Sequence, residues 1–331
     1  MQHLFLEICH IGFPLNRSSP HRLDKAHARA HFFHVLDTKL TLLRDSLRNL
    51  GSALIAYSGG VDSVFLAFIA NKVLPGRCVA AIADSPSLPR RELSEALDIA
   101  ARFNLPIRVI KTAEFGNSDY TSNPLNRCYF CKHDLFTELI PLAKKLSLAV
   151  IAYGENASDI GDFRPGAQAA NEFHIRAPLK EAGLTKTEIR ALSARFGLPT
   201  TDKPQMACLS SRVPHGEPVT EEKLRMIEAA ENLLRDLGFF DIRVRHHELP
   251  STVIPAPVKT PARLNNLAIT PPRSALARIE VGAVELPRLL DSKTAARVAE
   301  ELKRIGYAHV TLDLQGYRRG GANNLAQTPI T

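Results

Sequence analysis

ALIAYSGGVDSVFLAF, residues 53–68, joins a short apolar run to an apolar helical pattern through a loop with two adjacent glycines. The run at 53–57 is typical of a buried strand, and the pattern that begins at Val61 is typical of a helix. Gly59 and Gly60 carry no Cβ, so the backbone can turn sharply there and approach an anion closely. The amides at the N-terminus of the following helix would point at that anion, and the helix dipole favours negative charge. The sequence therefore predicts a phosphate-binding loop between a strand and a helix.

Side chains around the glycine pair add to this loop. Ser58 and Ser63 supply hydroxyl donors on either side, and Asp62 is predicted to cap the helix or to contact Mg²⁺. The loop is not a Walker A sequence, because that sequence has a lysine for the β- and γ-phosphates and this loop has none. SGGVDS instead resembles the PP-loop of the ATP pyrophosphatases, which include GMP synthetase, NAD synthetase, asparagine synthetase and tRNA thiolases. That resemblance implies that Ser58, Gly59, Gly60, Asp62 and Ser63 bind ATP, which is cleaved between its α- and β-phosphates.

Short apolar runs alternate with helical patterns on both sides of this loop. The predicted strands are 53–57, 78–83, 107–110 and 149–153, and the predicted helices between them are 61–72, 90–103 and 132–146. This alternation predicts right-handed crossovers and a doubly wound parallel sheet, an α/β fold that binds ligands at the carboxyl ends of its strands. The resemblance to the PP-loop implies that this fold is an adenine nucleotide alpha hydrolase-like domain.

The chain is expected to divide into several parts. We predict a disordered extension at 1–37, a PP-loop ATP pyrophosphatase domain at 38–214 that begins with a helix, a smaller C-terminal α+β domain at 215–320, and a tail at 321–331. Within the second domain, residues 249–275 contain six prolines. Proline removes donors from a strand ladder, so this segment is predicted to be a flexible insertion between paired strands.

Composition excludes several classes of protein. A hydrophobic fraction of 45% in 331 residues is enough to fill two cores, and no apolar run is long enough to span a membrane. The net charge of +8 includes +1 from residues 1–38 and +3 from 249–275, which leaves +4 for the remaining body and argues against a nucleic-acid partner. Five cysteines and no signal-peptide pattern indicate a reducing cytoplasm.

A second motif, NRCYFCK, places Cys128 and Cys131 at the start of a predicted helix, where the dipole is expected to lower the thiol pKa and favour thiolate. A third cysteine, Cys208, lies in KPQMACLSSR. From spacing alone three interpretations stay open: a redox pair, a zinc site completed by His133, and a [4Fe-4S] cluster with one iron free of protein ligands.

Further motifs extend from about residue 38 to residue 320, apart from the proline-rich insertion. They are GDFRPG at 161–166, ACLSSRVPHG at 207–216, AAE ending at Glu231, RVR at 243–245, ARIEV at 277–281 and YAHVTLDLQGYRRG at 307–320. With SGGVDS and NRCYFCK, they make the chain similar to the LarE-type ATP-dependent sulfur transferases of nickel-pincer nucleotide cofactor synthesis.

The resemblance implies a reaction in two steps. A carboxylate of pyridinium-3,5-biscarboxylic acid mononucleotide attacks the α-phosphate of ATP, giving an acyl-adenylate and pyrophosphate, and sulfur then replaces AMP to leave a thiocarboxylate. One branch of the family takes the sulfur from a lone cysteine, and the other uses three cysteines that hold a [4Fe-4S] cluster. The presence of Cys128, Cys131 and Cys208 favours the cluster branch, with Cys208 itself as sulfur donor as the alternative. Homo-oligomers and other nickel-pincer biosynthesis proteins are the implied partners, and ATP with Mg²⁺ is the implied cofactor.

The resemblance also implies roles for single residues. The implied binding residues are Ser85 for the nucleotide, Asp159 for Mg²⁺ or AMP, and Arg164, Ser211, Arg212, Glu231, Arg243 and Arg245 for the substrate. Guanidinium groups match phosphate oxygens, so Arg212, Arg243 and Arg245 are expected to clamp the substrate's phosphate. Glu231 is expected to orient an arginine, with a solvated surface glutamate as the alternative. A simple turn would explain Ser85 equally well, and a loop salt bridge would explain Arg164.

Two other functions compete with this interpretation. A tRNA thiolase also combines a PP-loop with CxxC, but it should carry an RNA-binding module or a broad basic face. A non-catalytic PP-loop relic that binds nucleotide or metal is the other alternative, and the intact SGGVDS argues against it.

Overall fold

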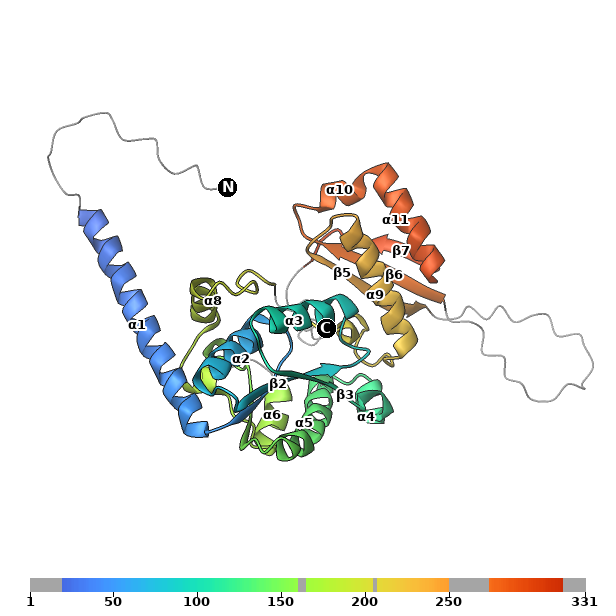
Figure 1. Cartoon of the computed structure of the whole chain (residues 1–331). Coiled ribbons are helices and arrows are strands. Elements are labelled where there is room, and N and C mark those ends of the chain that lie inside the picture. Colours follow the sequence, from blue (N-terminus) through green and yellow to red (C-terminus); the bar gives the residue numbers. More distant parts are fainter. Residues whose placement is uncertain (1–19, 160–164, 205–206, 250–273, 318–331) are drawn as a thin grey trace, which may run out of the picture.

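The computed structural model describes residues 20–159, 165–204, 207–249 and 274–317. Two sheets organise the chain, and helices pack on each of them (Figure 1). Among the described residues, no helix is both long enough and apolar enough to cross a membrane.

The first sheet has four parallel strands: β1 (Ala53–Ala56), β2 (Cys78–Asp84), β3 (Ile107–Lys111) and β4 (Val150–Tyr153). Their order is β3-β2-β1-β4. The chain adds β2 and β3 on one side of β1 and then crosses to pair β4 with the other side of β1. Figure 1 shows α2 (Val61–Val73) and α3 (Arg90–Arg102) on one face, and α5 (Arg127–Lys145) and α6 (Pro165–Glu172) on the other. The predicted doubly wound α/β fold is therefore confirmed. The loops after β1 and β4 meet where the strand order reverses, which is where such sheets bind ligands.

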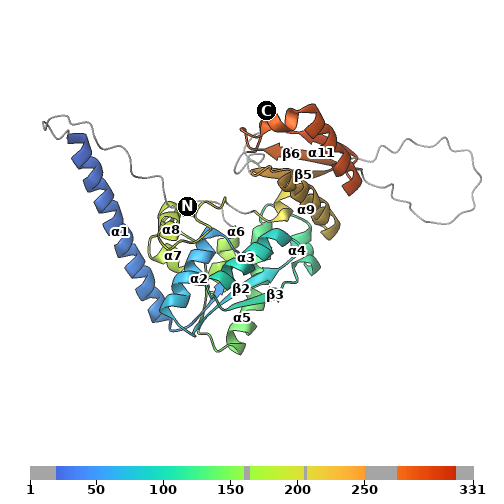
Figure 2. The ribbon, with the colours of Figure 1, turned by 45° about the horizontal axis from the view of Figure 1, so that its top comes forward.

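The first helix is longer than the sequence indicates. Helix α1 spans Pro20–Leu50, so residues 20–37, which we expected in a disordered extension, are helical. Pro20 suits the first helical position, and no glycine or proline interrupts the chain before Gly51. In its second half, Leu36, Leu40, Leu43 and Leu47 are buried in the core that α1 shares with α2 and α7 (Pro178–Glu181). Figures 1 and 2 show the N-terminal half projecting away from the other elements.

Short elements carry the chain between these helices and toward the second sheet. They are η1 (Glu114–Gly116), α4 (Ser118–Thr121), η2 (Ala157–Asp159), α8 (Lys186–Arg195) and η3 (Leu209–Arg212). A capping box formed by Thr185 and Glu188 starts α8, because each residue bonds the other's backbone amide.

The second sheet forms a mixed α+β unit, as predicted. Its strands are β5 (Ile242–Leu249), β6 (Ser274–Val281) and β7 (His309–Leu312), and its helices are α9 (Glu221–Asp236), α10 (Leu286–Leu290) and α11 (Ser292–Ile305). Strand β6 lies in the middle, antiparallel to β5 and parallel to β7. Leu249 pairs directly with Ser274, so the chain leaves and re-enters this ladder at the same level. The proline-rich insertion between them falls outside the described residues, apart from its ends, and its flexibility stays a prediction.

Candidate functional site

The loop after β1 requires glycine at its first turn. Gly59 has φ of 72°, and a Cβ at this position would lie 2.6 Å from the Cβ of Ala96 in α3. No other residue type fits there without moving α3. The hydroxyl of Ser63 accepts a hydrogen bond from the backbone amide of Ser58 at 3.1 Å and lies 3.1 Å from the Ser58 hydroxyl. The loop thus closes on itself and leads into the N-terminus of α2.

Backbone from β4 approaches this loop closely. A Cβ at Gly154, just after β4, would lie 2.9 Å from the backbone nitrogen of Ser63. The two loops therefore touch at the reversal point of the sheet, and the residues after β4 border the predicted phosphate site. Asp159 accepts a hydrogen bond there from the backbone amide of Asn156 at 3.1 Å, and Arg164 lies outside the described residues.

Asp62 does not cap α2, contrary to that part of our prediction. Gly60 occupies the cap position and no side chain caps it, while Asp62 lies in the first turn and forms an ion pair with Lys186. Lys186 is the first residue of α8 and lies 124 residues from Asp62 in the chain. The structure thus brings to the loop the lysine that the loop itself lacks. We did not predict Lys186 from the sequence, because its only local signal is the capping box that starts α8.

The carboxyl end of β2 carries a hydroxyl cluster. Ser85 accepts a hydrogen bond from the backbone amide of Ser87 at 3.0 Å, which is the turn expected as the simpler alternative for Ser85. The hydroxyls of Ser87, Tyr120 and Ser210 form a buried triangle with oxygen–oxygen distances of 2.5, 2.8 and 2.8 Å. This cluster, which no sequence motif indicates, joins the end of β2, α4 and η3.

The segment before and within η3 is held against the first sheet. Leu209 donates a backbone hydrogen bond to the carbonyl of Ser87 at 2.9 Å, and Arg127 of α5 donates to the carbonyl of Ser210 at 3.1 Å. Figure 2 shows α9 of the second unit near α3. Arg91 of α3 forms an ion pair with Asp236 of α9. These contacts fix Cys208 and Arg212 beside the carboxyl ends of the first sheet's strands, where the phosphate loop also lies.

The cysteines of the NRCYFCK motif lie in the first two turns of α5, at the start of a helix as predicted, and Cys208 lies directly before η3. The expected lowering of the pKa values of Cys128 and Cys131 is wrong. Burial raises the pKa of Cys131 to about 12, with Cys208 adding to the effect and Lys132 opposing it. Burial and Cys208 likewise raise the pKa of Cys128. Desolvation of the thiolate thus outweighs the helix dipole.

No metal-binding geometry is present in the part of the chain that the structure describes. No three His, Cys, Asp or Glu side chains there form a group that could hold a metal ion. His133, the residue that could have completed a zinc site, packs edge-on against Phe173 with ring centroids 4.9 Å apart.

Glu231 holds an arginine, and the surface-glutamate alternative is wrong. Its side chain is 0% exposed, and it accepts from Nε and Nη2 of Arg212 at 2.8 and 3.1 Å. It also accepts from Arg235 at 3.3 Å and from the backbone amide of Val244 at 3.1 Å. Burial alone would raise the pKa of Glu231, but the Arg212 charge and hydrogen bonds lower it below the usual range. Nη1 of Arg212 donates to the carbonyl of Cys208 at 2.9 Å, so this pair positions the third cysteine.

The two arginines of β5 differ in their ion-pair partners. Arg245 forms an ion pair with Glu280 at 2.9 Å and donates to the carbonyl of Ser211 at 2.7 Å. Arg243 lies over the ring of Tyr317 at 4.6 Å and forms no ion pair among the described residues. Burial and the neighbouring Arg212 lower the pKa of Arg243. Arg243 is therefore the buried cation best suited to take an anion.

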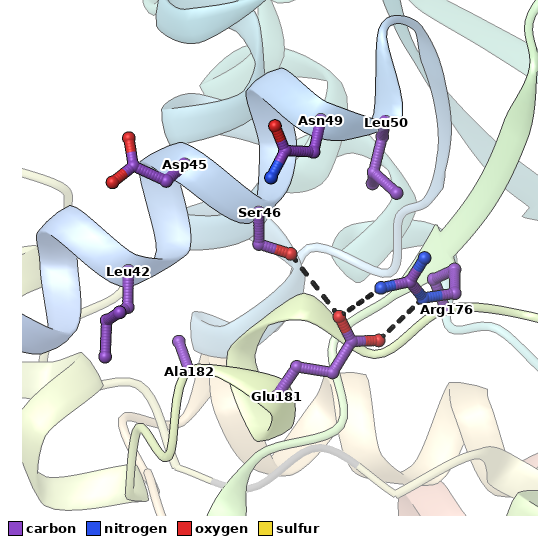
Figure 3. Close-up of a pocket in the computed structure, with 8 residues that line it drawn as sticks. All are labelled: Leu42, Asp45, Ser46, Asn49, Leu50, Arg176, Glu181 and Ala182. Carbon is purple, nitrogen blue, oxygen red and sulfur yellow. Dashed lines mark hydrogen bonds and ion pairs between the residues drawn. The ribbon is translucent and has the colours of Figure 1, made fainter.

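A separate hollow of about 410 Å³ lies between α1 and α7 (Figure 3). Arg176 and Glu181 pair at 2.7 Å on its wall, and Ser46 of α1 donates to Glu181. None of the residues predicted for the site lines it.

Comparison with known proteins adds relatives that cover most of the chain. No family model matches. An uncharacterized protein of Synechocystis sp. is 39% identical over 88% of this chain and 99% of its own length. The pyridinium-3,5-bisthiocarboxylic acid mononucleotide synthase of Lactiplantibacillus plantarum is 29% identical over 87% of this chain and 95% of its own. A glutamine-hydrolyzing GMP synthase chain of Thermoplasma volcanium is 25% identical over 59% of this chain and 67% of its own.

Proposed function

Because the chain belongs to the family of LarE-type sulfur transferases, we propose that it adenylates a carboxylate of pyridinium-3,5-biscarboxylic acid mononucleotide and converts it to a thiocarboxylate. A carboxylate oxygen is a poor leaving group until it carries AMP, so adenylation must precede sulfur transfer. The observation that carries the proposal is the position of residues 207–212. This one segment binds the end of β2 through Leu209, carries Cys208, and presents Arg212 to Glu231.

The phosphate loop and Lys186 would bind ATP. Amides at the start of α2, with the Ser58 and Ser63 hydroxyls, would face the phosphates, and Lys186 would supply positive charge for the departing pyrophosphate. Lys186 pairs with Asp62, which keeps the lysine at the mouth of the loop. Asp62 and Asp159 are the carboxylates we propose for Mg²⁺, which prefers oxygen ligands and substrate phosphates. Ser85 would border the ribose.

The arginines of η3 and β5 would bind the phosphate of the substrate mononucleotide. Arg243 has no carboxylate partner among the described residues, so it would take the phosphate directly. Arg212 and Arg245 are anchored by Glu231 and Glu280 and would add charge from fixed positions, with the Ser211 hydroxyl beside them. We include Arg164 from the sequence pattern alone.

Cys128, Cys131 and Cys208 would hold a [4Fe-4S] cluster, since three thiols from two neighbouring segments match its preferred donors. Metal binding would require these thiols to lose their protons. When bound, the cluster would carry the sulfide that enters the product. Direct donation by Cys208 is the alternative source. We also propose a homo-oligomer that acts with other nickel-pincer biosynthesis proteins.

The reaction is tested with ATP, Mg²⁺, sulfide and the biscarboxylate mononucleotide under anaerobic conditions. We expect AMP and pyrophosphate in equal amounts, and a product mass that reports replacement of one oxygen by sulfur. Lys186→Met should weaken pyrophosphate binding roughly tenfold or more, because a charge-assisted hydrogen bond is lost. Lys145→Met, an exposed lysine at the end of α5, is the matched control. Normal pyrophosphate binding by Lys186→Met would remove Lys186 from the mechanism.

The sulfur source is tested by iron and labile-sulfide analysis of anaerobically purified protein. About four irons per chain that are lost in Cys128→Ala would support the cluster. Cys78→Ala is the control, because Cys78 is buried in β2 away from the motif and should not affect iron. Iron-free protein that still forms thiocarboxylate, with one sulfur atom lost from Cys208, would instead support direct donation.

A further inference from the structure

Arg243 is a buried cation without a carboxylate partner in the part of the chain that the structure describes. Its residue is 8% exposed, and its Nη1 donates to the carbonyl of Ile242, the residue before it, at 2.6 Å. The carboxylate of Glu231, which bonds the next backbone amide of β5, is already paired with Arg212 and Arg235. A buried charge destabilises the folded state unless other groups compensate it. The group that lies against Arg243 is the side chain of a tyrosine.

Tyr317 holds Arg243 by two different contacts. The central guanidinium carbon lies 4.6 Å from the centre of the tyrosine ring, and Nη2 donates to the tyrosine hydroxyl at 3.3 Å. An aromatic ring attracts a cation on its face through its quadrupole and leaves the charge of the cation in place. The N–H groups of a guanidinium lie in its plane, so a ring on its face leaves the other N–H groups available to an anion.

The turn after β7 places this ring beside the arginine. Gly316 has φ of 67°, and a Cβ there would lie 2.8 Å from the carbonyl oxygen of Val281, so another residue type would force the backbone to move. The backbone amide of Tyr317 then donates to the same carbonyl at 2.8 Å. Val281 pairs with Ile242 in the ladder of β5 and β6, directly before Arg243. Both the backbone and the side chain of Tyr317 are therefore fixed next to Arg243.

We propose that Tyr317 is a positioning residue, which holds Arg243 with its charge intact so that the guanidinium binds the phosphate of the substrate mononucleotide. A carboxylate at this position would fix the arginine equally well, but it would cancel the charge, as Glu231 does for Arg212. Through Arg243, Tyr317 thereby determines how well the protein discriminates the mononucleotide from the nucleoside that lacks the phosphate. This inference rests on the proposed function, and it concerns a residue outside the phosphate loop and the cysteine motif.

Calorimetric titration of the whole chain with pyridinium-3,5-biscarboxylic acid mononucleotide, and with its nucleoside, tests this role without any need for turnover. Tyr317→Leu removes the ring and should weaken mononucleotide binding roughly tenfold, with little effect on the nucleoside. Tyr317→Phe keeps the ring and should lose no more than roughly threefold. Phe239→Leu is the matched control, because Arg288 lies over that ring at 4.5 Å, and it should keep the wild-type ratio of the two affinities.

The ratio of the two affinities separates this role from a purely structural one. Circular dichroism checks that each variant is folded, and Tyr317→Met, which fills more of the ring's volume, replaces Tyr317→Leu if that variant is unfolded. A wild-type ratio in the folded variant without the ring, or an equal loss for both ligands, would overturn the inference. Wild-type protein that binds both ligands equally would refute the role of Arg243 in phosphate binding, and wild-type protein that binds neither would refute the proposed substrate.

Discussion

Replacing Glu231 with glutamine tests how the substrate arginines are held. Glu231 accepts two hydrogen bonds from Arg212, one from Arg235 and one from the Val244 amide, and it is 0% exposed. Glutamine has nearly the same shape but carries no charge, and its amide group would point donors at the donors of Arg212. The variant therefore leaves a buried guanidinium without compensation.

The expected loss follows from this geometry. Removing one partner of a buried ion pair costs about 3–5 kcal/mol, because the desolvated charge that remains is unpaired. With a urea m-value of about 2.5 kcal/mol/M, the unfolding midpoint should fall by about 1–2 M. Since the pKa of Glu231 is lowered, its contribution is complete above the ordinary carboxyl range and is lost as pH falls through the folded-state value. The gap between wild type and variant should therefore be full at pH 7 and close only in strong acid.

Urea unfolding followed by circular dichroism at pH 7 measures this difference. Glu300→Gln is the matched control, because Glu300 pairs with Arg304 on the surface of α11 and is 65% exposed. Its loss should cost under about 0.5 kcal/mol. A midpoint for Glu231→Gln within about 0.3 M of wild type would refute the reasoning, since it would mean that Arg212 needs no buried counter-charge.

Two further predictions concern the phosphate loop and the second sheet. Gly59→Ala should abolish ATP binding in calorimetric titrations, because its Cβ would meet Ala96 at 2.6 Å, whereas Gly76→Ala, with the same φ of 72° and nothing within 4 Å, should retain it. Equal loss of ATP binding in both variants would contradict this. Burial lowers the pKa of His246 to about 4 from its ordinary 6.5, so the unfolded chain binds an extra proton between these values and stability falls as pH falls through that window. His246→Phe should lose less stability than wild type between pH 7 and pH 4.5 in urea unfolding, and an equal loss would contradict the assignment.

Much of the first sheet is predictable because its signals are local. Alternating apolar runs and helical periods require only neighbouring residues, so strands β1 to β4 and their helices fall close to the expected ranges. Helix α1 begins earlier than expected because helix propensity continued upstream of the apolar stripe that we used to place it. The domain boundaries that we assigned remain predictions.

The candidate site was less predictable, and the reason is its reliance on distant contacts. Residue types and spacing predicted the loop, the three cysteines and the arginines. They did not predict the burial, the ion pairing or the pKa of any of these residues. Whether Glu231 is buried, whether Arg243 is paired and whether a thiol is desolvated all depend on which elements pack around them. Such solvation effects have no signature in a short motif.

The amino-acid sequence alone determines the phosphate loop, since two glycines, two serines and a helix start suffice to form it. It also determines which segments of the first unit become strands and which become helices. Folding adds the groups that no short motif can supply. It brings Lys186 to Asp62 across 124 residues and Glu231 to Arg212 across 19. The physical reason is that charge compensation acts through space, so a partner for a buried charge can come from any part of the chain that packing places beside it.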